Sequence, residues 1–278
     1  MRYTASTPAL ALALFACETN DQPPTTPSPD NNQTSVCLEG RPFQADGTLS
    51  VEGAGEANAT RVADLRWEAH EGCERFVVDL STEATVPASG VNRVAAQVLR
   101  DLGVVRIHLP GIRNVAADAT DMEANGELVR EAFAIWAPDG DGTYIDIHLA
   151  SAAEVHVHVL TDPARVVVDL RPGVSAIPSA PARSNAVAVL TPRAGAQSYP
   201  LRVTGYARTF EANVVARLEQ DGEEVFSDFT TATAWADAWD YFEITIPEGP
   251  SGSVTLHVGE HSARDGTWQG AEIPLEMD

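Results

Sequence analysis

Hydrophobic and polar residues alternate with a period of two along most of the chain after residue 60, which is typical of β-strands with one buried face. In 241–246, for example, the even-numbered residues are Phe, Ile and Ile, whereas the odd-numbered ones are Tyr, Glu and Thr. We predict strands at 61–69, 75–80, 104–109, 131–136, 143–149, 154–160, 165–170, 186–190, 201–204, 212–218, 224–233, 241–246, 253–259 and 271–277. The pattern therefore predicts an all-β protein.

Residues 91–102 depart from this alternation. Their apolar residues recur at intervals of three or four, which predicts a short helix. The segments between strands contain turn formers instead. Asp139-Gly-Asp-Gly142 predicts a tight turn between two strands, and Asp221-Gly222 predicts the tip of a second hairpin.

A chain of 278 residues is long enough for about two domains, and residues 173–185 divide it. This segment is rich in Pro, Ala and Ser, which predicts a semi-rigid linker with little to pack against. We expect two β-sandwich domains, the first at 36–172 and the second at 186–278, each with its own core and only a small contact between them.

The N-terminal residues 1–17 predict a secretory signal. Arg2 precedes a short apolar run that ends in Leu14-Phe-Ala-Cys17, and the run is far shorter than a membrane-spanning helix of roughly 20 residues. The last four residues resemble a bacterial lipobox, which implies a lipid anchor on Cys17; secretion with cleavage elsewhere is the alternative. Residues 18–35 are polar and Pro-rich, which predicts a disordered tether.

Two other cysteines, Cys37 and Cys73, remain after processing at Cys17. An even pair in an exported chain predicts a disulfide. Two separate thiols or a metal-binding pair are the alternatives, although no third or fourth cysteine is present to complete a zinc site.

The charge of the chain excludes one class of partner. It contains 40 acidic and 18 basic residues, for a net charge of −22, and every basic residue is arginine. Nucleic-acid binding needs clustered cations, so we expect no nucleic-acid partner and no membrane contact except through the lipid anchor. The acidic surface keeps the protein soluble; adaptation to salt or recruitment of a cationic partner are the alternatives.

The strongest candidate for a chemical site consists of His148, His156 and His158. His156 and His158 are two residues apart, so their side chains leave the same face of a strand. If the two strands that carry these histidines form a hairpin, the allowed registers place the three imidazoles beside a carboxylate, which could bind a divalent metal. The interpretation that we favour is a polar strand face with cross-strand hydrogen bonds and charge pairs.

Other chemical signatures are weak. The sequence has no Gly-x-Ser-x-Gly, no His-Glu-x-x-His and no Gly-rich phosphate turn, so we predict no catalytic residue, no bound metal and no cofactor. Trp235, Trp239 and Tyr241 lie among polar neighbours. Exposed aromatics of this kind suit sugar stacking or protein contacts; alternatively, one tryptophan fills the sandwich core and the other covers an edge.

Two motifs in the last third of the chain identify a related family. Pro200-Leu-x-Val-x-Gly-x-Ala-x-x-Phe-Glu-Ala212 and Ser262-Ala-x-Asp-Gly266 together resemble the immunoglobulin-like domain of bacterial spore-germination and other cell-envelope proteins. The resemblance covers about residues 187–278. It implies a β-sandwich in the cell envelope and implies no reaction.

An internal repeat marks the first domain. Glu74-Arg-Phe-Val-Val-Asp-Leu80 recurs as Ala164-Arg-Val-Val-Val-Asp-Leu170, directly after Thr161-Asp-Pro163. A β-domain that opens and closes in this way is similar to the AMIN and AMIN-like domains, which are associated with the cell wall. The resemblance implies binding to peptidoglycan or to an envelope protein. Together with the lipobox-like N-terminus, it leads us to expect a non-catalytic lipoprotein of the cell envelope. A metal-dependent enzyme or sensor built on the three histidines is the alternative.

Overall fold

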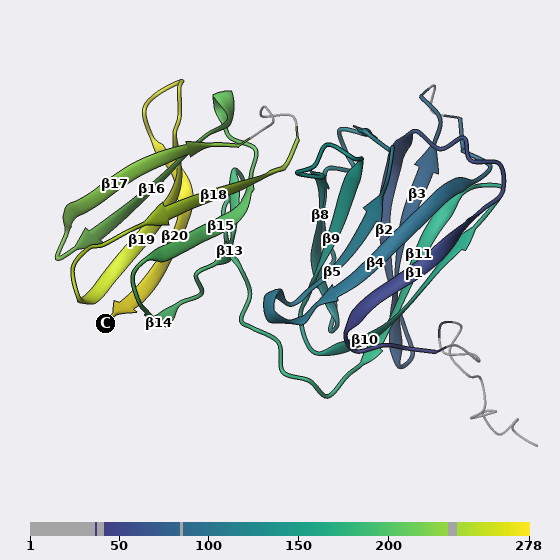
Figure 1. The fold of residues 1–278 in the computed structure, drawn as a ribbon, viewed down its shortest axis with the longest axis horizontal. Coiled ribbons are helices and arrows are strands. Elements are labelled where there is room, and N and C mark those ends of the chain that lie inside the picture. The colour runs from purple at the N-terminus through teal and green to yellow at the C-terminus, as the bar shows by residue number, and fades with distance from the viewer. Residues whose placement is uncertain (1–36, 38–41, 84–85, 233–237) are drawn as a thin grey trace, which may run out of the picture. The chain divides into compact units, whose positions relative to one another are not determined.

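The computed structural model describes Cys37 and residues 42–83, 86–232 and 238–278. The predicted signal peptide, Cys17 and all of the predicted tether at 18–35 lie outside these residues. Residues Thr34–Asp278 form one compact unit. Its regular structure is almost entirely β-strand, with two single-turn helices, so the all-β prediction is confirmed (Figure 1). Within the described residues, no helix is long and apolar enough to cross a membrane.

The first domain consists of two sheets that share one core. The six-stranded sheet has the order β1-β4-β5-β9-β8-β7, and the five-stranded sheet has the order β10-β11-β3-β2-β6. The strands are β1 (Gly47–Ala54), β2 (Arg61–His70), β3 (Cys73–Ser81), β4 (Val91–Leu99), β5 (Val104–Leu109), β6 (Asn114–Val115), β7 (Asp121–Glu123), β8 (Val129–Trp136), β9 (Thr143–Leu149), β10 (Ala153–Leu160) and β11 (Arg165–Pro172). Phe76, Val166 and Ile107, from β3, β11 and β5, are fully buried in that core.

The second domain has the same two-sheet plan. A four-stranded sheet has the order β12-β13-β15-β18, and a five-stranded sheet has the order β14-β20-β19-β16-β17. The strands are β12 (Ala182–Arg183), β13 (Val187–Thr191), β14 (Gly195–Gln197), β15 (Leu201–Ala207), β16 (Asn213–Gln220), β17 (Glu223–Thr231), β18 (Asp240–Ile246), β19 (Gly252–His261) and β20 (Trp268–Met277). The predicted Asp221-Gly222 hairpin joins β16 to β17.

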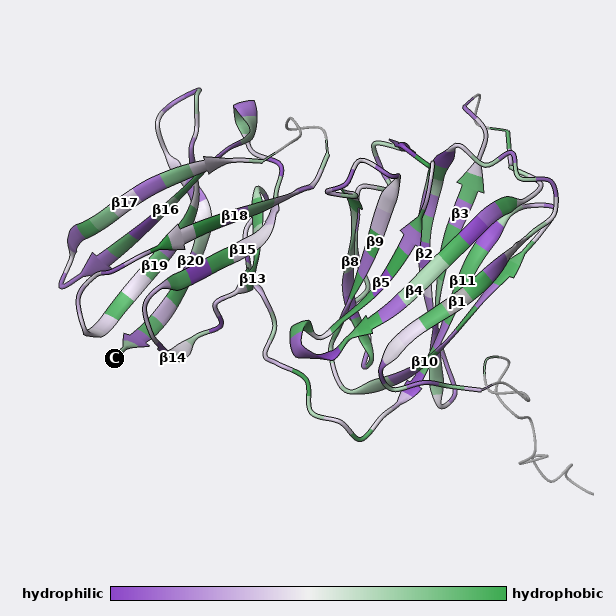
Figure 2. Ribbon diagram, viewed as in Figure 1, coloured by the Kyte–Doolittle hydropathy of each residue, from purple (hydrophilic) through white to green (hydrophobic). Residues whose placement is uncertain are grey.

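The alternation that predicted these strands is visible in the structure as bands of hydrophobic and hydrophilic residues along single strands (Figure 2). Side chains leave a strand on alternate sides, so one set enters the core and the other faces outward. In β18, Phe242, Ile244 and Ile246 are buried in the second core. The outward-facing side chains of each sheet are the ones available to form a binding site.

The predicted helix at 91–102 is wrong. Residues Val91–Leu99 form β4, which pairs with β1 and β5, and only Arg100–Leu102 make a single helical turn. Gly53 of β1 lies so close to Asn92 that a β-carbon there would overlap the Asn92 backbone. Close pairing around this glycine disturbs the period of two, and sheet pairing overrides the local helical spacing.

The hairpin between 143–149 and 154–160, on which the three-histidine alternative depended, does not form. Strand β9 pairs with β5 and β8, whereas β10 pairs with β11 in the other sheet. The chain crosses from one layer of the sandwich to the other between them. The predicted turn at Asp139-Gly-Asp-Gly142 is confirmed, because it joins the antiparallel strands β8 and β9.

The segment between the two domains packs more than the sequence suggests. Ile177 lies against the first core, and Ala182–Arg183 pair with β13. A separate buried cluster contains Phe133, Ile135, Ala188, Leu190, Tyr206 and Trp239. This cluster draws on both domains, so the two sandwiches contact each other directly.

Candidate binding face

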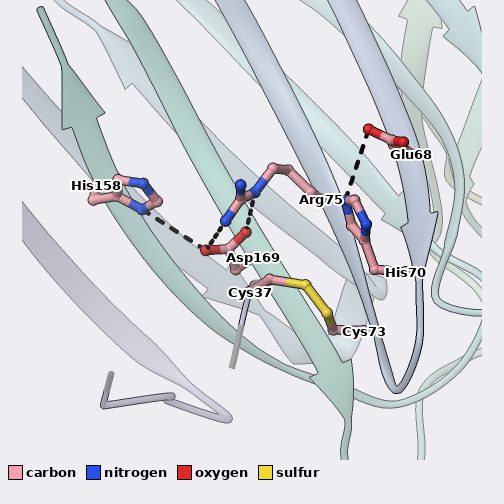
Figure 3. The surroundings of a disulfide bond; sticks show 7 residues. All are labelled: Cys37, Glu68, His70, Cys73, Arg75, His158 and Asp169. Carbon is pink, nitrogen blue, oxygen red and sulfur yellow. Dashed lines mark hydrogen bonds and ion pairs between the residues drawn. A yellow bond between two sulfur atoms is a disulfide. The ribbon is translucent and has the colours of Figure 1, made fainter. Parts of the chain in front are cut away.

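The predicted disulfide between Cys37 and Cys73 is present, with 6.5 Å between the two Cα atoms (Figure 3). Cys73 is the first residue of β3, and both cysteines are buried. The bond attaches the residue that follows the predicted tether to the five-stranded sheet of the first domain. Disulfides are typical of exported proteins, so this bond agrees with an exported chain.

The internal repeat has a structural meaning on this sheet. Its two copies are β3 and β11, which pair antiparallel at the middle of the sheet. The pairing places Arg75 opposite Asp169 and Arg165 opposite Asp79, so the arginine of each copy faces the aspartate of the other. These four side chains lie on the outward face, since Phe76 and Val166 beside them are in the core.

The two Arg–Asp positions have different partners. Arg75 binds Asp169 with two hydrogen bonds, Nε–Oδ1 at 2.6 Å and Nη2–Oδ2 at 3.1 Å, and His158 Nδ1 lies 3.9 Å from the same carboxylate (Figure 3). Asp79 instead binds Arg66 of β2 through both carboxylate oxygens. In the described part of the chain, Arg165 forms no ion pair and donates to the carbonyl of Pro163 at 3.4 Å.

A groove of about 530 Å³ lies on this outward face, and we call it the arginine groove. Its lining residues are Leu65, Arg66, Trp67, Glu68, Arg75, Val77, Met122, Leu160, Arg165 and Val167. Three guanidinium groups, one carboxylate and six apolar side chains line the groove, in a chain with a net charge of −22. Two of the three arginines are paired with Asp79 and Asp169, but Arg165 has no ion pair in the described part of the chain. A guanidinium group binds carboxylates, so Arg165 makes the groove suited to an anionic ligand with an apolar part.

The structure does not bring the three candidate histidines together. His156 and His158 stack on the outward face of β10, with 5.4 Å between ring centroids. His148 belongs to β9 in the other sheet, where it is buried against Phe133 and Tyr206. The hypothesis of a three-histidine metal site is wrong because it depended on a β9–β10 hairpin. Among the described residues, no group of three or more His, Cys, Asp or Glu side chains could hold a metal ion.

A second Arg–Asp pair, which sequence reasoning missed, lies on the outward face of the six-stranded sheet. Arg106 of β5 binds Asp146 of β9 through Nε–Oδ1 and Nη2–Oδ2, both at 2.7 Å. The hydroxyl of Tyr206, from the second domain, also donates to Asp146. Burial lowers the pKa of Arg106, but its bonds and attraction to Asp146 raise that pKa more, so the guanidinium group stays charged. Burial also raises the pKa of Tyr206, which keeps the hydroxyl protonated.

His148 lies beside this pair in the same buried layer. Neither ring nitrogen has a hydrogen-bond partner within the described residues, and burial lowers the pKa of the imidazole to about 4. Glu131 is directly opposite on β8 and is bound by Arg183. Burial raises the pKa of Glu131, although the charge of Arg183 opposes that shift. The layer is therefore a set of buried charge pairs around a neutral histidine.

The aromatic residues of 235–241 differ in their exposure in the structure. Trp239 is fully buried, with its ring edge-on to Phe133 at 4.9 Å, so it offers no exposed face. It contacts the first domain rather than the core of its own sandwich. Tyr241 is partly exposed on β18, and Trp235 lies outside the described residues. His257 faces away from the second core but is buried between Glu219 and Glu272.

The comparisons with known proteins support one of the two domain resemblances. Residues 186–267 match the family model described as the immunoglobulin-like domain of bacterial spore germination. The second domain is thus similar to that family. No curated protein and no solved structure matches the chain. The match covers β13 to β19 of the second sandwich, and it leaves the AMIN-like resemblance of the first domain without support.

Proposed function

We propose that this chain is a non-catalytic, lipid-anchored protein of the cell envelope, and that its first domain binds peptidoglycan through the arginine groove. The observation that carries the proposal is the outward face of β2, β3 and β11. Three arginines gather there around an apolar floor, although the chain as a whole is strongly acidic.

An envelope location is supported by three features. The second domain matches an immunoglobulin-like family of spore germination, whose model describes a domain rather than a reaction. The Cys37–Cys73 disulfide suits an exported protein. The lipobox-like sequence that ends at Cys17 would attach the chain to a membrane. The first domain would then lie close to the cell wall.

The AMIN-like assignment of the first domain is part of this proposal. Its support is the paired repeat, because the two Arg-x-Val-x-Asp segments that suggested the resemblance are neighbouring strands of one sheet. Their outward arginines, Arg75 and Arg165, line the arginine groove together with Arg66. The feature that suggested the family therefore also builds the proposed binding face.

The charge of the arginine groove indicates which part of peptidoglycan the groove would bind. Stem peptides end in carboxylates and carry small apolar side chains, so they match guanidinium groups above a floor of Val77 and Val167. Arg165 is the best placed to bind, because it forms no ion pair in the described part of the chain. Arg66 already holds Asp79, and it would contribute its remaining N–H groups.

The test is co-sedimentation of the soluble chain from Glu18 to Asp278 with purified sacculi. We expect saturable binding that weakens as salt is raised, because the contacts are ionic. Arg165→Gln should weaken binding by about tenfold, since a hydrogen bond to a charged group contributes on the order of 1.5–3 kcal/mol. Arg93→Gln is the matched control, because it removes an exposed arginine from β4 in the other sheet.

The control separates the two parts of the proposal. Equal loss of binding in both variants would mean that net charge, not the groove, governs the interaction. Absence of binding by the wild-type chain would exclude peptidoglycan, and an envelope protein with an acidic segment would become the next ligand to test.

A further inference from the structure

A second pocket, of about 340 Å³, lies where the outward face of the six-stranded sheet meets the four-stranded sheet of the second domain. Its lining residues are Leu102, Arg106, Ile135, Pro138, Tyr144, Leu190, Thr191, Arg202, Thr204, Tyr206 and Tyr241. We call it the tyrosine pocket. Residues from both domains line it, which is a common location for ligand sites.

The walls of the pocket are aromatic and apolar. Tyr144 of β9 stands on one side, held by the Arg106 guanidinium 4.5 Å from its ring centroid. Tyr206 and Tyr241 come from the other side, where they are directly opposite each other on β15 and β18. Both Tyr144 and Tyr241 are only partly buried, so their rings are accessible to a ligand.

The polar groups of the pocket are hydroxyls and neutralised charges. Thr191 and Thr204 join their hydroxyls at 2.7 Å. Each of the two arginines already holds a carboxylate: Arg106 binds Asp146, and Arg202 binds Glu243 with bonds of 2.7 and 2.6 Å. A charged ligand would have to displace one of these internal carboxylates, whereas an uncharged one would not.

The pocket combines aromatic faces with several hydroxyls and has no net charge. These features favour an uncharged ligand with a flat apolar face and polar groups at its edge. Tyrosine rings stack on flat apolar surfaces, and their hydroxyls bond polar groups at the edge. A sugar ring presents both features at once: C–H groups on one face and hydroxyls around its edge. We propose that the tyrosine pocket binds a ring of a neutral saccharide, stacked against Tyr144 and Tyr241, with its hydroxyls bonded to Thr191, Thr204 and the arginine N–H groups.

This site is distinct from the arginine groove, which lies on the other sheet of the first domain and selects anions. The neutral saccharide could come from the N-acetylhexosamine strand of peptidoglycan or from another envelope polysaccharide. Two soluble probes distinguish these sources, because neither carries a charge: tetra-N-acetylchitotetraose for the first and maltotetraose for the second.

The test is isothermal titration calorimetry, which measures the dissociation constant of each probe for the soluble chain from Glu18 to Asp278. We expect saturable binding of one of them that is little affected by salt. Tyr241→Leu and Tyr144→Leu keep apolar volume but remove the aromatic face, and each should weaken binding by about tenfold. Phe229→Leu is the matched control, because it removes an aromatic side chain that is 66% exposed on β17. Thr204→Val, which removes a rim hydroxyl with little change of shape, tests the site if a tyrosine variant does not fold.

The outcomes are separable from those of the peptidoglycan experiment. Binding of the chitin oligomer assigns the site to the glycan strand, and binding of maltotetraose assigns it to another polysaccharide. Failure of both probes overturns the saccharide site without affecting sacculus binding through Arg165. Binding that survives in the tyrosine variants and in Thr204→Val would also overturn it.

Discussion

Two Arg–Asp pairs of the first domain, one on each sheet, hold a fully buried aspartate in two different settings. Arg75–Asp169 is the open pair, on the outward face of the five-stranded sheet, and Arg106–Asp146 is the covered pair, on the outward face of the six-stranded sheet. In both pairs the aspartate side chain is 0% exposed and the arginine is about a quarter exposed, at 24% and 25%. The aspartates are therefore equally buried, and the pairs differ in what lies over them.

The neighbours of each pair decide what it can do. His158 approaches the open pair, and the arginine groove runs beside it. The covered pair receives the Tyr206 hydroxyl and lies beside the buried cluster of Phe133 and Trp239. The open pair is thus suited to ligand contact. The covered pair fixes one domain to the other, since its third partner belongs to the second domain.

The largest expected difference comes from neutralising each aspartate. Asp146→Asn leaves the Arg106 charge without its counter-ion beneath the second domain, which should cost about 3–5 kcal/mol of the free energy of unfolding. Asp169→Asn should cost about 1–3 kcal/mol, because Arg75 lies opposite the exposed Glu68 and can turn toward water. Urea denaturation of the two variants measures both values. Equal losses would show that the second domain adds nothing to the covered pair.

The strands themselves follow from the sequence, and the errors have physical causes. Period-two alternation is a local property, so it located β18 and the turn at Asp139-Gly-Asp-Gly142. It cannot tell whether consecutive strands pair or cross between the sheets of a sandwich. That limitation produced the false β9–β10 hairpin and, with it, the false cluster of His148 with His156 and His158.

The two pairs also show which residues of a site can be found from the amino-acid sequence. Arg75 and Asp169 belong to a visible repeat, and the antiparallel pairing of its copies explains why they meet. Asp146 and His148 lie in an ordinary alternating strand, where an outward polar residue normally faces water. Only the packing of a second domain, which residue spacing does not encode, makes them buried. The alternation at 143–149 therefore placed these side chains on the correct face but in the wrong environment.

A smaller effect concerns the covalent bond at the edge of the open face. Cys37 and Cys73 are 36 residues apart, and closing a loop of that length should stabilise the fold by about 3–4 kcal/mol in the chain-entropy model. The double variant Cys37→Ala/Cys73→Ala should lose that amount in urea denaturation at pH 7. Wild-type protein denatured without reductant should show no free thiol from these two residues, and two reactive thiols would contradict the bond.

A pH effect distinguishes the covered layer from the open face. The pKa of His148 is about 4 in the fold and close to 6.5 when unfolded, so between these values the unfolded chain binds more protons. The contribution of His148 to stability is therefore present above pH 6.5 and is lost as the pH falls toward 4. At pH 5 the loss should be about 2 kcal/mol relative to pH 7. The raised pKa of Glu131 acts in the opposite sense, since its contribution falls as the pH rises.

The measurement is the free energy of unfolding at pH 7 and pH 5 for wild type and His148→Leu. His148→Leu should lose less stability than wild type between the two values, by about 2 kcal/mol. The charged groups that act on His148 are the same in both proteins: Asp146, Arg193, Arg183 and Arg106. An identical pH dependence in His148→Leu and wild type would contradict a buried neutral imidazole.

The central claim is that the open face, and not the covered one, meets the anionic ligand. The most direct test is hydrogen–deuterium exchange of the soluble chain with and without a glycan-free peptidoglycan stem peptide, which has carboxylates and no sugar for the tyrosine pocket. We expect slower exchange in segments from β2, β3 and β11, with no change in β5, β9 and β15. Protection of β5, β9 and β15 alone, or no protection anywhere at saturating peptide, would contradict the claim.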